Sequence, residues 1–288
     1  MKEYLRALEY ILENGKNKND RTGTGTKSVF GYQMRFDLRK EFPAVTTKKL
    51  AFRGVVSELL WMLEGSSDER RLAEIRYEDK RENLIGKRTI WTANANKQGK
   101  DLGYTNTDLV KDLGPIYGHQ WRTWNAVNGY VDQIANVLEG LHNNPDGRRH
   151  IVSAWNADKV DVMALPPCHA FFQFYVCDGE LSCQLYQRSV DAPLGLPFNI
   201  ASYSLLVYMF AQILGLKPGE FVHTSGDLHI YHNQIDAVSE QLKRDPLPGP
   251  TLIMPAFTNL EELLQTKTSD YELMNYNHHP AIDIPFAT

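Results

Sequence analysis

The chain has 288 residues, 42% of them hydrophobic, which is enough to bury a substantial core. Its formal net charge of -4 lacks the basic face expected of a nucleic-acid-binding protein. No run of 18 apolar residues predicts a membrane span, and the N-terminus has no signal-peptide hydrophobic stretch. Three cysteines without a CxxC pair favour neither a disulfide framework nor a zinc site, so we expect a reducing, cytoplasmic setting and no metal.

Hydrophobic periodicity predicts the elements of the first half of the chain. Residues 4–13 have the apolar spacing of a helix, and residues 30–38 alternate as a half-buried strand. The strongly apolar segment 52–63 predicts a helix that ends at Gly65. A further helix is expected at 131–141, before an Asn-Asn-Pro-Asp-Gly turn.

A β-hairpin is the most distinct local signal in the middle of the chain. Two strand-like runs, 168–177 and 180–188, flank an Asp-Gly pair, which is favoured in a two-residue type I′ turn. The uniform register set by this turn places Cys168 opposite Ser189 at the open end. Strict alternation would point Arg188 away from the Cys168 face, so a bulge or a frayed strand end is needed to bring the two side chains together.

The second half is predicted from one buried helix and the elements after it. Residues 200–214 are apolar almost all round, as in a helix enclosed by protein, and a strand at 220–231 and a helix at 234–244 follow. The polar segment 82–113 is loop-like. We therefore expect an α+β fold, with a mostly antiparallel or mixed sheet packed with helices, in a single domain over residues 1–288.

Cys168, in an LPPCH segment, is the candidate nucleophile. A thiolate is a strong nucleophile, and nearby cationic groups lower the pKa of a thiol. A cysteine entering an apolar strand is more often a core residue, and we interpret Cys177 and Cys183 in that way. The predicted neighbours Arg188 and Ser189, with the two stiffening prolines, favour a function for Cys168.

Several polar residues allow two interpretations. Arg21, in a Gly-Thr segment, and the pair Arg148-Arg149, after a turn, belong either to solvated surfaces or to a phosphate site. Glu58 is surrounded by apolar residues, so it lies either at a helix edge or in a partly desolvated place that raises its pKa towards acid/base use. Asn199 is either the N-cap of the buried helix or an amide that reads a base edge.

Taken together, the motifs closely resemble the thymidylate synthase family, and His229 and Tyr231, which alone read as an ordinary strand, are part of that match. The matching stretches run in family order over nearly the whole chain: DRTGTGT at 20–26, SELLW at 57–61, DLGPIYGHQWR at 112–122, RRHIVSAWN at 148–156, ALPPCHAFFQFYV at 164–176, QLYQRSVDAPLGLPFNIASY at 184–203 and GDLHIY at 226–231.

The resemblance implies reductive methylation of dUMP to dTMP, with 5,10-methylenetetrahydrofolate as cosubstrate and dihydrofolate as product. Cys168 would add to carbon 6 of uracil, Glu58 would organise proton transfers through water, and Tyr117 would help to remove the carbon-5 proton. The catalytic residues implied are Cys168, Glu58, Tyr117, Asn199, Asp191 and Arg188.

The resemblance also implies two binding sets and an obligate sheet-to-sheet homodimer. The substrate-binding residues implied are Arg21, Arg148, Arg149, Arg188, Ser189, Gln187, Asn199, His229 and Tyr231, with Arg148 and Arg149 donated across the dimer interface. The folate-binding residues implied are Ile90, Trp91, Leu165, Asp191, Leu194, Gly195, Phe198, Phe286 and Ala287.

Two alternatives accompany this expectation. Pro193, Asn94, Phe286 and Thr288 depart from the family pattern near the folate, which keeps open a dUMP 5-hydroxymethylase giving 5-hydroxymethyl-dUMP and tetrahydrofolate. A catalytically silent nucleotide- or RNA-binding relative would have lost its nucleophile or its acid/base, and both are present. Asn199 favours dUMP over dCMP, because related dCMP hydroxymethylases carry Asp there. Residues 67–110 resemble a variable insertion within the domain.

Overall fold

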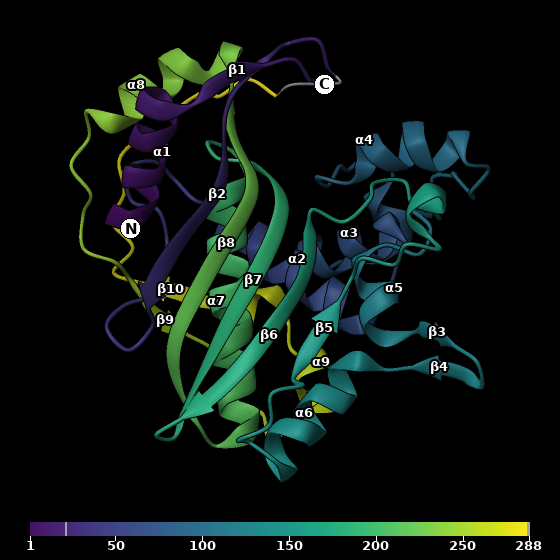
Figure 1. The fold of residues 1–288 in the computed structure, drawn as a ribbon. Helices are drawn as coiled ribbons and strands as arrows, with labels where there is room; N and C mark the ends of the chain where they lie inside the picture. The colour runs from purple at the N-terminus through teal and green to yellow at the C-terminus, as the bar shows by residue number, and fades with distance from the viewer. Residues whose placement is uncertain (21, 287–288) are drawn as a thin grey trace.

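A six-stranded mixed sheet forms the centre of the protein in a computed structural model that describes residues 1–20 and 22–286 (Figure 1). The strand order is β1-β2-β8-β7-β6-β5, and every neighbouring pair is antiparallel except the parallel pair β7–β8. The strands of this sheet are β1 (Lys16–Lys18), β2 (Thr26–Asp37), β5 (Ile151–Ser153), β6 (His169–Cys177), β7 (Glu180–Asp191) and β8 (Lys217–Tyr231). Two small pairs lie outside it: β3 (Trp124–Ala126) with β4 (Gly129–Val131), and β9 (Thr251–Ile253) with β10 (Glu272–Met274).

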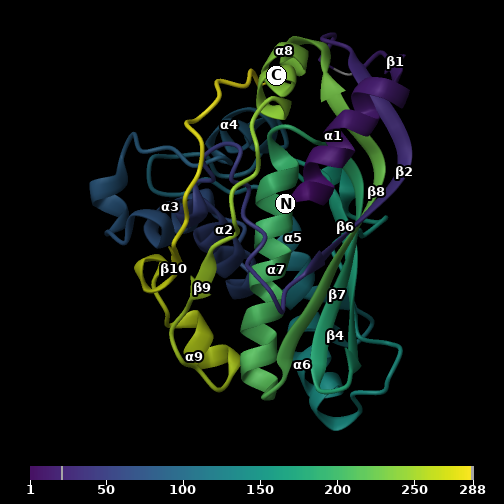
Figure 2. The same cartoon turned by 90° about the vertical axis from the view of Figure 1, so that its left-hand side faces the viewer.

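Helices pack on one face of this sheet, with the longest, α7, along its length (Figure 2). The α-helices of the described residues are α1 (Lys2–Asn14), α2 (Phe52–Glu64), α3 (Glu69–Tyr77), α4 (Thr92–Asn94), α5 (Tyr117–Arg122), α6 (Gln133–Asn143), α7 (Gly195–Leu214), α8 (Ile235–Leu242) and α9 (Leu260–Leu264). By length and composition α7 alone, within the described residues, would suffice to cross a membrane. It is instead mostly buried against α2, β7 and β8, as a core helix is. The predicted α+β fold with a mixed sheet is confirmed.

The predicted end of helix α2 and the hairpin turn are confirmed. Helix α2 stops at Gly65, which has a φ of 84° and donates its backbone N–H to the carbonyl of Met62. Glycine adopts this left-handed conformation without the steric cost of a Cβ. Asp178 and Gly179 have φ values of 52° and 75°, as a type I′ turn requires.

The register at the open end of the hairpin is not the predicted one. Pairing is uniform from the turn to Phe171, but a β-bulge between His169 and Phe171, one of the two irregularities expected at this end, shifts the ladder by one residue. Cys168 therefore lies opposite Arg188, whose backbone N–H donates to the Cys168 carbonyl at 2.9 Å, and not opposite Ser189. The prediction that Cys177 is a core residue is also wrong, because it is exposed beside the turn.

Two helices differ from the expectation. Helix α3 was not predicted, although the Asp68 side chain caps it by accepting from the Arg70 backbone N–H. Helix α7 begins at Gly195 and includes Pro197 in its first turn, where a missing N–H costs nothing. Asn199 therefore lies inside the helix, and its interpretation as an N-cap is wrong.

Helices α2 and α5 approach each other closely at Gly118. A Cβ on Gly118 would lie 2.6 Å from the Met62 carbonyl oxygen and 3.2 Å from the Gly65 Cα. Only glycine permits this separation, because a Cβ at such distances would clash with backbone atoms. The contact fixes the helix that carries Glu58 against the helix that begins at Tyr117.

Candidate active site

A cavity of about 620 Å³ gathers most of the predicted site residues on its wall. They come from α2, the start of α5 and α7, the segment around Trp91, the segment before β6, strands β7 and β8, and the C-terminal segment. The predicted residues that line it are Glu58, Ile90, Trp91, Tyr117, Leu165, Cys168, Gln187, Ser189, Asp191, Leu194, Gly195, Phe198, Asn199, His229, Tyr231 and Phe286.

Cys168 lies on this wall with its backbone fixed from two sides. Its N–H donates to the Tyr117 hydroxyl at 2.8 Å, and its carbonyl accepts from Arg188. Burial raises the pKa of the thiol, and this exceeds the opposing effects of the Arg188 charge and of Tyr117. The Arg188 charge lowers this pKa, as expected, but the larger effect of desolvation makes the net shift upward.

Arg188 does not line the cavity. Its guanidinium donates to the carbonyls of Pro167 at 2.9 Å and Pro166 at 2.8 Å, and it lies over the Trp155 ring at 5.4 Å. These contacts hold the two-proline segment that leads into Cys168. Arg188 thus orients the nucleophile from behind while its charge stays close to the sulfur.

Glu58, Trp91 and Tyr117 form a second cluster of chemical groups on the wall. The Trp91 indole N–H donates to a Glu58 carboxylate oxygen at 2.6 Å, and the Trp91 and Tyr117 rings meet edge to face at 5.8 Å. Burial raises the pKa of Glu58, whereas the indole N–H opposes that rise. Burial also raises the pKa of Tyr117 well above its ordinary value, so Tyr117 is protonated.

Asn199 faces the cavity and is held by Gln187, whose side-chain N–H donates to the Asn199 carbonyl oxygen at 3.0 Å. His169, which was not predicted, lies beside Asn199 between the rings of Tyr117 and Tyr203. Burial lowers the pKa of His169 to about 4, so the imidazole is neutral. The bulge between His169 and Phe171 turns the His169 side chain towards the cavity. In the sequence, the only signal for this residue is that it follows Cys168.

His229 and Tyr231 line the cavity from β8. His229 is paired with Asp227 at 3.0 Å, and Asp227 also accepts from the Ser28 hydroxyl at 2.7 Å. These partners, with Lys18, hold the pKa of Asp227 well below its usual range. His229 is therefore fixed by a carboxylate that stays ionised.

Asp191 lies at the end of β7, where it accepts from the Leu194 backbone N–H at 2.9 Å and from Gln234 at 3.2 Å. Burial raises the pKa of Asp191. Gln234 also donates to the Pro285 carbonyl at 3.0 Å, which ties the C-terminal segment next to Phe286 to the same wall.

One side of the cavity is apolar and is bordered by cations. The apolar side chains on this side are Ile90, Leu165, Leu194, Phe198 and Phe286. Together they form a surface against which a flat aromatic ligand could pack. Arg76 and Arg88 also line the cavity, and they were not predicted, since residues 67–110 resemble a variable insertion. Their charges suit an anionic group on a ligand.

The remaining predicted residues lie elsewhere. Arg148 and Arg149 are exposed and do not line the cavity. Arg21 and Ala287 lie outside the described residues, as does the departure at Thr288. No group of three His, Cys, Asp or Glu among residues 1–20 and 22–286 could hold a metal ion.

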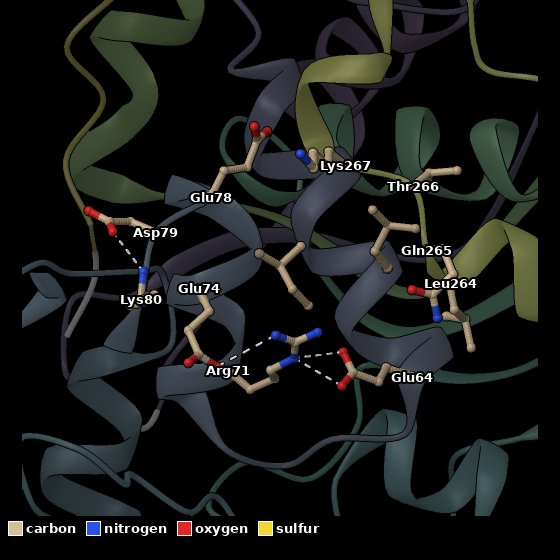
Figure 3. Close-up of a pocket in the computed structure, with 12 residues that line it drawn as sticks. Glu64, Arg71, Glu74, Glu78, Asp79, Lys80, Leu264, Gln265, Thr266 and Lys267 are labelled. Atoms are coloured by element: carbon tan, nitrogen blue, oxygen red, sulfur yellow. Dashed lines mark hydrogen bonds and ion pairs between the residues drawn. The ribbon is translucent and has the colours of Figure 1, made fainter. Parts of the chain in front are cut away.

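A second cavity of about 620 Å³, between α2, α3 and the segment after α9, has different chemistry. Figure 3 shows Arg71 of this cavity between Glu64, at 2.9 Å, and Glu74, at 3.6 Å. Glu78 accepts from the Ser269 backbone N–H and hydroxyl. These carboxylates are already paired within the protein, so the cavity with Cys168 is the candidate active site.

Comparison with known protein families agrees with this geometry. The family model described as thymidylate synthase matches residues 2–288, essentially the whole chain.

Proposed function

The chain belongs to the thymidylate synthase family, whose members are folate-dependent methyltransferases acting on dUMP, and from this premise we propose the reaction that it catalyses. It converts dUMP to dTMP with 5,10-methylenetetrahydrofolate and releases dihydrofolate, in the cytoplasm. The observation that carries the proposal is that Cys168, Glu58 and Asn199 face one cavity. Those three groups supply a nucleophile, an acid/base and a base-reading amide.

The covalent step joins the Cys168 sulfur to carbon 6 of uracil. As the C–S bond forms, the carbon 5–carbon 6 double-bond electrons move towards the carbonyl at position 4, where the amide of Asn199 stabilises the negative charge. The thiol proton leaves through water towards Glu58. Tyr117 holds the Cys168 backbone at 2.8 Å, which supports attack from a fixed position.

Carbon 5, with the electron pair of the enolate, would next bond to the one-carbon unit and so carry both that unit and its original proton. It then loses this proton, and Tyr117 is the group that we place beside it. Its raised pKa keeps the hydroxyl as a donor that orients the water accepting the proton. Glu58, whose pKa is raised by burial, is the acid/base that we assign to these proton transfers. Asp191 and the backbone of Leu194 shape the folate side of the cavity.

Folate supplies the one-carbon unit and the hydride when it is bound. We assign its ring system to Ile90, Trp91, Leu165, Leu194, Gly195, Phe198 and Phe286, next to Asp191 and the C-terminal residues. The nucleotide sugar is assigned to His229 and Tyr231, and the phosphate to Arg21, Arg188 and Ser189, with Arg148 and Arg149 from a second copy of the chain.

The second copy packs sheet to sheet in this proposal, and each copy is a single domain. Phe171 and Tyr175 point out of β6 with 42% and 62% of their surface exposed, and Ile151 of β5 is 44% exposed. Such an apolar face favours association. Mixing inactive Cys168→Ala and Arg149→Ala proteins should restore activity, because one site of each mixed dimer has both residues. Failure to restore any activity in mixed dimers would contradict the shared site.

Product analysis tests the reaction itself. Methylation gives dTMP with dihydrofolate, whereas a hydroxymethylase gives 5-hydroxymethyl-dUMP with tetrahydrofolate. The retention of Trp91, which packs on Tyr117 and Glu58, supports methylation, because it shields the reacting methylene carbon from water. A covalent adduct with 5-fluoro-dUMP and methylenetetrahydrofolate is expected, and Cys168→Ala should not form it. Absence of the adduct in the unaltered protein would indicate a silent relative.

A further inference from the structure

A chain of buried side chains runs behind Asn199, away from the cavity. Gln187 lies between Asn199, at 3.0 Å, and His223, at 2.9 Å. His223 is fully buried on β8, and its second ring nitrogen lies 3.2 Å from the Ser225 hydroxyl. None of the reaction steps described above uses His223 or Ser225.

The orientation of Gln187 is determined by a backbone group. One end of its amide lies 3.1 Å from the carbonyl oxygen of Ser189, which can only accept a hydrogen bond. This end must be the NH₂ group, so the other end, facing His223, is the carbonyl oxygen. The same NH₂ group faces Asn199, so the Asn199 atom that it meets must be the oxygen.

The orientation of Gln187 in turn fixes the proton of His223. Because the Gln187 oxygen can only accept, the Nε2 of His223 must carry a proton and donate it. Burial lowers the pKa of His223 to about 3, so the ring is neutral and carries one proton. Its Nδ1 is therefore an acceptor, and the Ser225 hydroxyl donates to it.

We infer that His223 is a positioning residue for base selection: its Nε2–H holds Gln187 so that Asn199 turns its NH₂ group towards the ligand. This inference rests on the proposed function, because it takes uracil as the base that Asn199 reads. Uracil has a carbonyl at position 4, which accepts from an NH₂ group, whereas cytosine has an amino group there, which would face another donor. The choice of uracil over cytosine thus depends on the tautomer of the buried His223 ring.

Loss of the His223 donor leaves the Gln187 oxygen buried without a partner. An unpaired buried carbonyl is costly, so Gln187 is expected to leave this position for the water of the cavity. Asn199 then loses its hydrogen bond from Gln187. With the side-chain hydrogen bond to His169 as the remaining contact that opposes rotation, the amide is expected to turn and to present its oxygen to cytosine. Loss of the His223 donor is therefore expected to change the preference for uracil over cytosine more than it changes the free energy of unfolding.

The test compares dUMP and dCMP binding in His223→Phe, which keeps a ring but removes the donor. The ratio of the dCMP Kd to the dUMP Kd is expected to fall by about tenfold, the effect of one lost hydrogen bond. His223→Gln, whose amide can donate again, should recover most of the ratio, and Ser225→Ala should lower it by about threefold. Ile230→Val, buried on the same strand but outside this chain of contacts, should leave it unchanged.

A ratio in His223→Phe equal to that of the unaltered protein would overturn the inference. If that variant does not fold, Ser225→Ala decides the same question. ¹⁵N NMR of the His223 ring tests the tautomer without any ligand, and a proton on Nδ1 would also overturn it. The 5-fluoro-dUMP adduct separates the two levels: no adduct in the unaltered protein removes both the proposed function and this inference, whereas a normal adduct with an unchanged ratio removes only the inference.

Discussion

The hydrogen bond between Trp91 and Glu58 should control the protonation of Glu58, and Trp91→Phe removes it. The indole N–H donates to the carboxylate at 2.6 Å and so favours the ionised form against the burial that raises its pKa. Hydrogen bonds to charged groups contribute about 1.5–3 kcal/mol. Since 1.36 kcal/mol corresponds to one pKa unit, the pKa of Glu58 should rise by about one to two units in the variant.

The raised pKa of Glu58 also makes the free energy of unfolding depend on pH. A pKa raised on folding gives stability that is present below the unfolded pKa and is lost as pH rises through the folded pKa. In Trp91→Phe this loss extends to a pH about one to two units higher than in the unaltered protein.

Carbon-13 NMR of labelled glutamate carboxyls measures the Glu58 pKa directly, with Glu58→Gln to assign the signal. Trp61→Phe is a matched control, because its indole N–H donates to the backbone carbonyl of Asp68 at 3.1 Å and not to Glu58. An unchanged or lower Glu58 pKa in Trp91→Phe would refute the reasoning, as would an equal rise in Trp61→Phe.

Three further substitutions test other parts of the structure. Burial lowers the pKa of Lys48 to about 8, so stability should rise by about 3 kcal/mol between pH 8 and 10.5, and urea unfolding should show this rise to be absent in Lys48→Met. Arg70→Met leaves the fully buried Glu69 carboxylate without its ion-pair partner and should lower the free energy of unfolding by about 3–5 kcal/mol; a loss below 1 kcal/mol would show that water reaches the pair. Tyr117→Phe should reduce kcat by about 10²–10⁴ while unfolding changes by about 1–3 kcal/mol, and near-normal kcat would remove Tyr117 from the chemistry.

Features set by short stretches of sequence could be predicted. The Asp-Gly pair requires positive φ at both positions, and the apolar run of α2 ends at a glycine that closes the helix. The residues on the cavity wall were largely predicted as well, because they lie in the motifs that resemble the family. Each of these features is determined by which residue types stand within one short stretch of the sequence.

Features that depend on distant contacts could not be predicted. The bulge beside His169 was expected only as one of two alternatives, the other being a frayed strand end, because no local signal decides between them or fixes the position of the register change. Arg76 and Arg88 come from the region that resembles a variable insertion, so only the structure shows that they line the cavity. Gln187 and His223 are 36 residues apart in the sequence, so their contact behind Asn199 could not be foreseen.

Because Gly118 has no Cβ, helices α2 and α5 can lie close enough to set the distance between Glu58 and Tyr117. Glu58 and Tyr117 stand on separate helices, and any methyl group between those helices would drive the two groups apart. Position 118 should therefore tolerate replacement as poorly as the nucleophile does, although it touches neither substrate. Searches for variants with altered turnover should look for such spacers as well as for residues that contact ligands.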